Sequence, residues 1–300
     1  MNIINKCLRT LYKIHNILAI HGLYNKLPDD TYIKKRYKAH FGFDLNLEQP
    51  TRFNEKLQWL KLNDKRLDYI TMVDKYAVKN YVADLIGADY IIPTLGVWNN
   101  PNEIDFDSLP DKFVLKCNHN SGLGMYICRD KSKMNISKIK KNLWKGLKQD
   151  YYLTGREWPY KKVPRKIIAE TFMSDGGIDL TDYKVHNFNG IPKFILVCRD
   201  RFSKSGLTED FYSTCWEHLD VKRPNIPNSK VPIAKPDELD EILELSRKLS
   251  VGIPFVRTDF YIINHQVYFS EITFFPASGF EKYEPDEWDY VFGDYLKLSR

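Results

Sequence analysis

Two acidic residues in the C-terminal part of the chain, Asp259 and Glu271, stand in strand-like segments that could face each other. Residues 255–275 are rich in β-branched and aromatic side chains and are interrupted only at 264–266, which predicts a hairpin with a three-residue turn. That register sets Asp259 opposite Glu271, with both side chains on one face of the ladder. Two facing carboxylates repel each other unless a cation lies between them.

The same register offers two candidates for that cation. Arg257, opposite Thr273, could neutralise Asp259 in an ordinary surface hairpin. The other candidate is Mg²⁺, which prefers carboxylate oxygens and usually takes only one or two of them, keeping phosphates and water as its other ligands. The opposite face of the hairpin is apolar as well, with Phe260, Ile262, Tyr268 and Ile272. We therefore expect a buried hairpin whose carboxylates need partners, and we favour a metal on Asp259 and Glu271.

A lysine stands inside a second predicted strand, FVLKC at 113–117. Inside a buried strand, Lys116 has to meet an anion. The loop that follows contains Ser121, Gly122 and Gly124, and glycines let backbone amides approach a phosphate closely. An ordinary hairpin turn has the same composition, and the GxxxxGK[ST] pattern of a Walker loop is absent. Lys116 makes this loop a candidate phosphate site.

The elements around these residues alternate between helices and hairpins. Helices are expected after Pro50 and around Lys75, and again after Pro236. Strands are expected over 166–173, which contains Glu170, and over 181–188, which contains Lys184 and leads into the Asn-Gly turn at 189–190. This order predicts an α+β fold of two lobes with a nucleotide between them.

Composition and length fit an ordinary soluble protein. The 300 residues are 43% hydrophobic and 28% charged, and no apolar run approaches the roughly 20 residues of a membrane-spanning helix. The five cysteines are scattered without a CxxC pair, which favours a reducing compartment over disulfides or zinc. No signal peptide is evident, so we expect a cytoplasmic protein. No RNA-binding motif, zinc knuckle or long basic block suggests nucleic acid.

The net charge of +6 lies at the N-terminus. Residues 1–40 hold eight Lys or Arg against Asp29 and Asp30, and the rest of the chain is balanced. The apolar residues of 1–24 recur at helical spacing with Lys6, Arg9 and Lys13 on another side, which predicts an amphipathic helix with a basic face. It could pack on the protein, or it could lie on an anionic membrane at the inner face.

Six segments together resemble the TupA-like branch of the ATP-grasp enzymes, which is found with bacterial capsular and teichuronopeptide polysaccharide synthesis. They are PTRFNEKLQWLKL, DKYAVKNYV, FVLKCNHNSG, IIAETFM, DYKVHNFNG and RTDFYIINHQVYFSEITFFPASG, and the likeness runs from about Thr31 onward. It implies two α+β lobes that sandwich ATP. We expect a basic helical arm at 1–50, a helical region at 51–110, a small lobe at 111–168 and a large lobe at 169–300.

The resemblance implies a nucleotide site. Lys75 and Lys116 fall where ATP-grasp enzymes place basic residues on the ATP phosphates, and the loop of Ser121, Gly122 and Gly124 would lie beside them. Residues 170–173, with Glu170 and Phe172, match the hinge that contacts adenine and ribose.

The resemblance also implies a reactive centre. Asp259 and Glu271 match the Mg²⁺ carboxylates, and Arg257 matches a basic residue near the γ-phosphate and the acyl phosphate. Thr273 stands where many ATP-grasp proteins have a metal-binding Asn, and we leave it out of the metal set. Lys184 stands where other branches often have an acidic ribose contact, so phosphate or acceptor binding is the better interpretation.

The chemistry that this family implies is ATP-dependent and Mg²⁺-dependent joining of a carboxylate to an amine through an acyl phosphate. The carboxylate would be a uronic acid of a surface polysaccharide or its precursor, and the amine an amino acid or small amine. One alternative is a glycosyltransferase, which would usually carry a DxD metal motif where this chain has RxD. A second alternative is a non-catalytic nucleotide-binding protein. The acceptor loops, 199–232 and 276–290, carry no motif that names a substrate.

Overall fold

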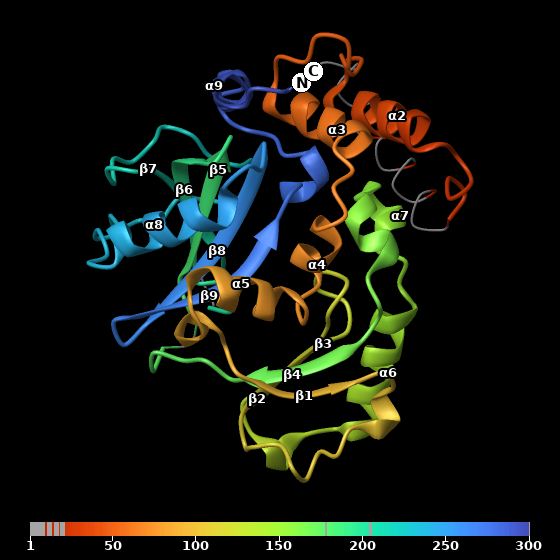
Figure 1. The fold of residues 1–300 in the computed structure, drawn as a ribbon, viewed down its shortest axis with the longest axis vertical. Helices are drawn as coiled ribbons and strands as arrows, with labels where there is room; N and C mark the ends of the chain where they lie inside the picture. The colour runs from red at the N-terminus through yellow and green to blue at the C-terminus, as the bar shows by residue number, and fades with distance from the viewer. Residues whose placement is uncertain are drawn as a thin grey trace.

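The computed structural model describes Thr10, Ile14, Leu18 and residues 22–177, 179–203 and 206–299. The basic amphipathic helix expected within residues 1–24 lies almost wholly outside these described residues and stays a prediction. Two separate β-sheets form the body of the described chain, with helices packed around them (Figure 1). In the part that the structure covers, no helix is both long enough and apolar enough to cross a membrane.

The smaller sheet has four antiparallel strands in the order β1-β4-β2-β3. Its strands are β1 Thr94–Trp98, β2 Phe113–Cys117, β3 Met125–Cys128 and β4 Ile167–Thr171. Helix α6, Ile136–Lys148, packs one apolar side, with Ile139 and Leu143, against Phe113 and Leu115 of the central strand β2. The alternation in FVLKC thus buries Phe113 and Leu115 under α6, while Val114 and Lys116 face the other way.

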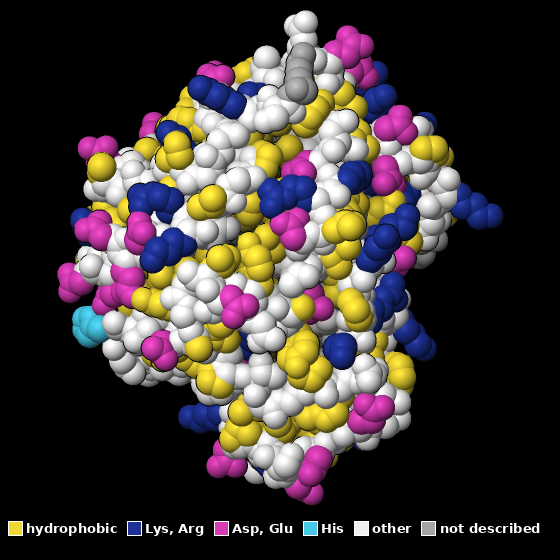
Figure 2. All heavy atoms as spheres, in the orientation of Figure 1, with side chains coloured by type: hydrophobic (Ala, Val, Ile, Leu, Met, Phe, Trp, Pro, Cys, Tyr) yellow, Lys and Arg dark blue, Asp and Glu magenta, His cyan; other side chains and the backbone are white. Residues whose placement is uncertain are grey.

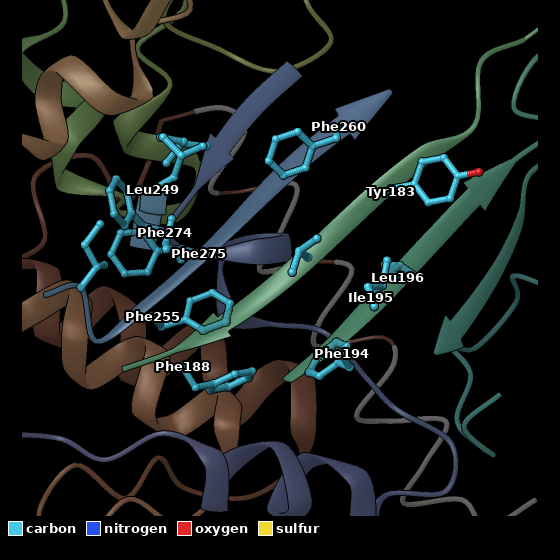
Figure 3. Close-up of a cluster of buried hydrophobic side chains, with 14 of the residues drawn as sticks. Tyr183, Phe188, Phe194, Ile195, Leu196, Leu249, Phe255, Phe260, Phe274 and Phe275 are labelled. Atoms are coloured by element: carbon cyan, nitrogen blue, oxygen red, sulfur yellow. The ribbon is translucent and has the colours of Figure 1, made fainter. Parts of the chain in front are cut away.

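The larger sheet has five antiparallel strands in the order β7-β6-β5-β8-β9. They are β5 Asp182–Phe188, β6 Ile191–Arg199, β7 Thr208–Ser213, β8 Phe255–Ile263 and β9 Gln266–Thr273. Asn189 and Gly190 both have positive φ and form the predicted two-residue turn between β5 and β6. Helix α8, Leu239–Ser250, covers one face, and aromatic side chains such as Phe188, Phe194 and Phe255 fill the core around the sheet (Figure 3).

The remaining helices are α2 Asp29–Phe41, α3 Phe53–Asn63, α4 Tyr69–Val73, α5 Val78–Ile86, α7 Tyr152–Gly155 and α9 Glu287–Tyr295. Short 3₁₀ turns lie in the connections between elements: η1 Ala88–Tyr90, η2 Pro101–Glu103, η3 Lys131–Lys133, η4 Trp158–Lys162 and η5 Pro276–Gly279. Of these helices, α3, α4, α5 and α9 contribute residues to the hydrophobic core of the larger sheet, whereas α2 packs on α3 and α7 on η4. Asn54 at the start of α3 donates to Asp289 of α9 from both its backbone and its side chain, at 3.0 and 2.8 Å. This buried contact holds α9 against the start of α3.

The residues that form each sheet do not follow the boundaries of the four expected regions. The sheet of the expected small lobe, 111–168, also contains β1, and its strand β4 continues to Thr171. The helices of the expected 51–110 region contribute Phe53 and Leu57 to the hydrophobic core of the larger sheet. Residues 51–110 therefore belong structurally to both sheets.

The β8–β9 hairpin has the predicted pairing but not the predicted turn. Asp259 lies opposite Glu271 as expected, although the turn has only two residues, Asn264 and His265, both with positive φ. A β-bulge at Ser270 supplies the one residue that the shorter turn lacks.

The bulge also changes the faces of β9. Tyr268 pairs with Tyr261 and so shares the face of Asp259, which makes its predicted place on the opposite face wrong. Val267, Phe269 and Ile272 are the buried apolar residues of this strand.

Candidate active site

A cavity of about 500 Å³ lies between the two sheets. Strands β2, β3 and β4 form one wall, and the face of the larger sheet turned away from α8 forms the other. Ten of the eleven predicted site residues line it: Lys75, Lys116, Ser121, Gly122, Glu170, Phe172, Lys184, Arg257, Asp259 and Glu271. Outside the cavity the charges are mixed, because acidic and basic side chains lie interspersed over the face shown in Figure 2.

Asp259 is buried between two cations. Arg257 donates to it through Nε and Nη2, both at 2.7 Å, and Lys184, directly across the ladder on β5, donates from Nζ at 2.6 Å. Burial alone would raise the pKa of Asp259, but the charges of Arg257 and Lys184 outweigh it and hold the pKa below its usual value. Neutralisation by Arg257, the alternative considered from the sequence, is therefore present, and Lys184 is a second partner that the sequence did not indicate.

Glu271 is the more open of the two facing carboxylates. Its side chain is 32% exposed, and its Oε1 lies 3.7 Å from Nζ of Lys75. Lys75 lies between α4 and α5 and also donates to the backbone carbonyl of Asn120 at 2.7 Å. One lysine thus connects the β8–β9 hairpin of the larger sheet with the loop after β2.

The anion that we expected beside Lys116 is a side chain of the protein itself, Glu170. Nζ of Lys116 lies 2.6 Å from Oε2 of Glu170 on the neighbouring strand β4, and Nζ of Lys79 lies 2.7 Å from Oε1 of the same carboxylate. Burial opposes the charge of Glu170, but the two ammonium groups prevail and lower its pKa. Two positive charges share one carboxylate here, so this wall has a surplus of positive charge for a further anion.

The two glycines of the predicted phosphate loop have different surroundings. Gly122 lines the cavity, and a Cβ there would meet nothing within 4 Å. Gly124 does not line the cavity; a Cβ there would lie 2.8 Å from the Cα of Gly146 on α6 and 2.7 Å from Sγ of Cys117. The absence of a side chain at Gly124 therefore serves the close packing of the loop on α6 and gives no contact with the cavity.

The end of β4 belongs to residues 170–173, the segment that the resemblance matched to the hinge. Phe172 lines the cavity, and the guanidinium of Arg129 lies over its ring at 5.2 Å from the centroid. Arg129 also lines the cavity and was not singled out from the sequence.

Five further charged residues of the cavity wall were missed: Asp179, Asp182, Arg201, Glu209 and Arg223. Arg201 Nη2 lies 3.0 Å from Asp182, and Arg223 Nη2 donates to Glu209 at 2.7 Å. Glu209 lies on β7, in a segment that we interpreted as part of an acceptor loop. The apolar residues Leu207 and Phe211, each two positions from Glu209, were the available signal for a strand here. The signal was weak because the strand has only six residues and contains the adjacent acidic residues Glu209 and Asp210.

Asp259 and Glu271 fit a divalent metal that arrives with a nucleotide. They are direct neighbours across the ladder, both line the cavity, and their oxygens are the hard ligands that Mg²⁺ prefers. Among the described residues, no group of three or more His, Cys, Asp or Glu could hold a metal ion without other ligands. Two carboxylates leave the remaining coordination positions to phosphate oxygens and water.

The comparison with known protein families gives a more specific result than the comparison with solved structures. The family described as TupA-like ATPgrasp matches residues 55–297. No curated protein matches the chain.

Solved structures resemble the chain at low identity. D-alanine-D-alanine ligase from Helicobacter pylori is 16% identical over 82% of this chain and 70% of that protein, with a TM-score of 0.43. The Bacillus anthracis enzyme complexed with ATP is 16% identical over 68% of this chain and 53% of its own, with a TM-score of 0.40. The ATP-grasp ligase PsnB complexed with a precursor variant, Mg and ADP is 9% identical over 85% and 64% of the two chains, with a TM-score of 0.39.

Proposed function

The chain belongs to the TupA-like ATP-grasp family and is a ligase of the ATP-grasp class, and we propose that it joins a carboxylate to an amine through an acyl phosphate, using ATP and Mg²⁺. One observation carries this proposal. The facing carboxylates Asp259 and Glu271 share a single cavity with the cations Lys75, Lys116 and Lys184. Paired carboxylates for a metal beside several cations for phosphates are what phosphoryl transfer requires.

The lysines of the two walls would hold the phosphates. Lys116 and Lys79 each contact one oxygen of the Glu170 carboxylate. Lys116 can therefore turn toward a phosphate while Glu170 keeps its ion pair with Lys79. Lys75 lies between Asn120 and Glu271, at the junction of the two walls. Both ammonium groups would stabilise the negative charge on the phosphate oxygens.

Asp259 and Glu271 would hold Mg²⁺, which neutralises phosphate charge when it is bound. Both oxygens of Asp259 are now engaged by Arg257 and Lys184. We infer an exchange of partners, in which these two cations move to the phosphates and release the carboxylate. No charge is then left unpaired in the buried site.

Arg257 and Lys184 would act on the transferred group. In the proposed reaction the substrate carboxylate takes the γ-phosphoryl group of ATP, and ADP leaves. The neutral amine then attacks the acyl carbon, phosphate leaves, and the nitrogen gives up a proton to form the amide. No protein nucleophile is needed, so the chain would contribute orientation, charge stabilisation and exclusion of water from the acyl phosphate. The side chain of Arg257 is 14% exposed and lies beside Asp259, in a position suited to stabilise the negative charge of the transferred phosphoryl group.

For the substrates we propose a uronic acid of a bacterial surface polysaccharide, or its precursor, and an amino acid or small amine. The association of this family with surface polysaccharides supports this choice.

For its location we propose the cytoplasm, with residues 1–24 packed on the protein or, as the alternative, lying on the inner membrane face. Lys34, Lys35 and Lys38 of α2 are exposed and would add to the basic surface. In the membrane alternative, flotation with anionic vesicles should show binding that falls with salt and is lost without residues 1–24. No binding at low salt would contradict the membrane part of the proposal.

Acyl-phosphate trapping tests the reaction. The protein is incubated with ATP, Mg²⁺, hydroxylamine and either glucuronic or galacturonic acid, and ADP and hydroxamate are measured. We expect both products, and an amide by mass when amino acids or ethanolamine replace hydroxylamine. Hydrolysis of a UDP-sugar with no ADP would favour the glycosyltransferase, and ATP binding without any product would favour a non-catalytic protein.

A further inference from the structure

Helix α6 has a strongly basic surface that the proposed phosphate and metal sites do not use. The helix contains five lysines and no acidic residue, and four of the lysines are exposed: Lys138, Lys141, Lys145 and Lys148. Their spacing of three and four residues places them on one side of the helix, along about 15 Å of its axis. We call these four residues the lysine stripe.

The charges of the lysine stripe are not balanced within the protein. In the part of the chain that the structure describes, none of the four ammonium groups forms an ion pair, and Asp150 just beyond the helix pairs with Arg165 instead. On α8, in contrast, the exposed Arg247 and Lys248 both pair with Glu244. Like charges three and four residues apart repel each other and destabilise a helix. A stripe that keeps this repulsion is suited to a ligand with several negative charges.

One flank of the lysine stripe adjoins the rim of the cavity. Asn142, next to Lys138 and Lys145 on the helix, donates from Nδ2 to the backbone carbonyl of Met125 at 2.9 Å. Met125 begins the edge strand β3, lines the cavity and is 41% exposed. The lysine stripe and the cavity thus lie on the two sides of the start of β3.

The other flank of the stripe has an exposed aromatic ring. Trp144 is 37% exposed, lies next to Lys141 and Lys148 on the helix, and has its ring 5.9 Å from Nζ of Lys148. The apolar side of α6 is packed on β2, so the helix cannot also insert that side into a membrane. An indole beside a row of ammonium groups fits a chain of charged sugars instead, because the C–H face of a sugar ring can stack on the indole while its carboxylate meets a lysine.

We propose that the lysine stripe and Trp144 bind a chain of uronic acids, so that the preferred carboxylate substrate is one sugar of a polymer. The inference rests on the proposed function for the identity of the sugar. Successive lysines of the stripe stand about 4.5–6 Å apart along the helix axis, close to the repeat of one sugar in an extended chain. With the chain on the stripe, a sugar beyond Met125 would reach the cavity.

Binding in the absence of nucleotide tests this surface separately from the reaction. Calorimetry measures the affinity of the protein for decamers of galacturonic acid and of glucuronic acid, and for the galacturonic acid decamer with methyl-esterified carboxylates. We expect a charged decamer to bind with an affinity that falls with salt, and the ester to bind at least about tenfold more weakly. No binding of either charged decamer at low salt, or equal binding of the ester, overturns the inference.

Two double variants locate the binding surface. Lys141→Gln/Lys145→Gln removes two charges from the stripe, and Arg247→Gln/Lys248→Gln removes two from α8, where Glu244 balances them. The first should weaken the charged decamer about tenfold, and the second, which is the matched control, should bind like the wild type. Equal affinities in the two variants overturn the inference.

Vesicles and the trapping reaction supply the remaining readouts. Flotation with anionic vesicles that is lost in Lys141→Gln/Lys145→Gln, without binding of either decamer, would assign the stripe to the membrane and overturn the inference. In hydroxamate formation, the same variant should raise KM for the decamer but leave kcat, and KM for free galacturonic acid, unchanged. Hydroxamate formation from the free sugar therefore tests the ligase function independently of the stripe.

Discussion

The two walls of the cavity balance their charges differently. On the smaller sheet, Lys79 and Lys116 share Glu170, which leaves a surplus of positive charge. On the larger sheet, Arg257 and Lys184 are matched by the facing carboxylates Asp259 and Glu271. The first wall can accept an anion as it stands, whereas the second can do so only if another cation takes over its carboxylates. This difference leads us to assign phosphate binding to one wall and joint binding of metal and phosphate to the other.

The largest effect is expected from Asp259→Asn, which removes the buried charge on the larger sheet while keeping the side chain's shape. We expect Mg²⁺-dependent ATP turnover to be abolished and the circular dichroism spectrum to be unchanged, because Arg257 and Lys184 can still contact the amide oxygen. Glu271→Gln should have the same effect on turnover. Wild-type turnover in either variant would remove the metal assignment. Glu244→Gln, on the exposed side of α8, is the control.

Removal of Mg²⁺ tests the exchange of partners on the larger sheet. If phosphates can take Arg257 and Lys184 only when a metal takes Asp259, the affinity for ATP should fall in EDTA by roughly 5- to 150-fold, the usual range of coupling between two ligands. Calorimetric titration of ATP with and without Mg²⁺ measures the ratio. In Asp259→Asn the ratio should shrink toward one, and equal affinities in the wild type would contradict the exchange.

On the smaller sheet, Lys116→Ala should weaken ATP binding at least about tenfold, since a charge-assisted contact contributes roughly 1.5 to 3 kcal/mol. Lys79→Ala is the comparison, because Lys79 contacts the same Glu170 but does not line the main cavity. Its affinity for ATP should change less than that of Lys116→Ala. Equal losses in the two variants, measured by calorimetry, would mean that the lysines act only through Glu170.

The smallest effect concerns the two glycines of the loop after β2. Gly124→Ala forces a methyl group against α6 at a residue with φ of +73°, and should lower the free energy of unfolding by about 1–3 kcal/mol. Gly122→Ala meets only the cost of its positive φ, about 1–2 kcal/mol, and adds a methyl group at the cavity. Urea unfolding and ATP affinity separate the two: we expect the larger loss of affinity at Gly122.

The sequence indicated the facing carboxylates because strand alternation and pairing are local properties. Asp259 and Glu271 are twelve positions apart, and only the short connection between them sets the register. The turn prediction was nevertheless wrong, since two positive-φ residues and a bulge give the same pairing as three turn residues. Arg223 could not be connected with Glu209 and Glu281, because their contact depends on how the irregular segment after β7 crosses the sheet. Partners of that kind follow from tertiary packing and have no spacing rule.

The bulge in β9 lets two consecutive side chains, Ser270 and Glu271, reach the same cavity, which a regular strand with its alternating faces does not allow. Two adjacent residues of the strand thereby present a hydroxyl and a carboxylate to the same cavity. Ser270 hydrogen-bonds with the side chain of Tyr261 but has no residue opposite it in the β8–β9 ladder, so a chain lacking it would keep Asp259 opposite Glu271 and every charge in place. Deletion of Ser270 would therefore change the shape of the cavity without changing the charges that line it.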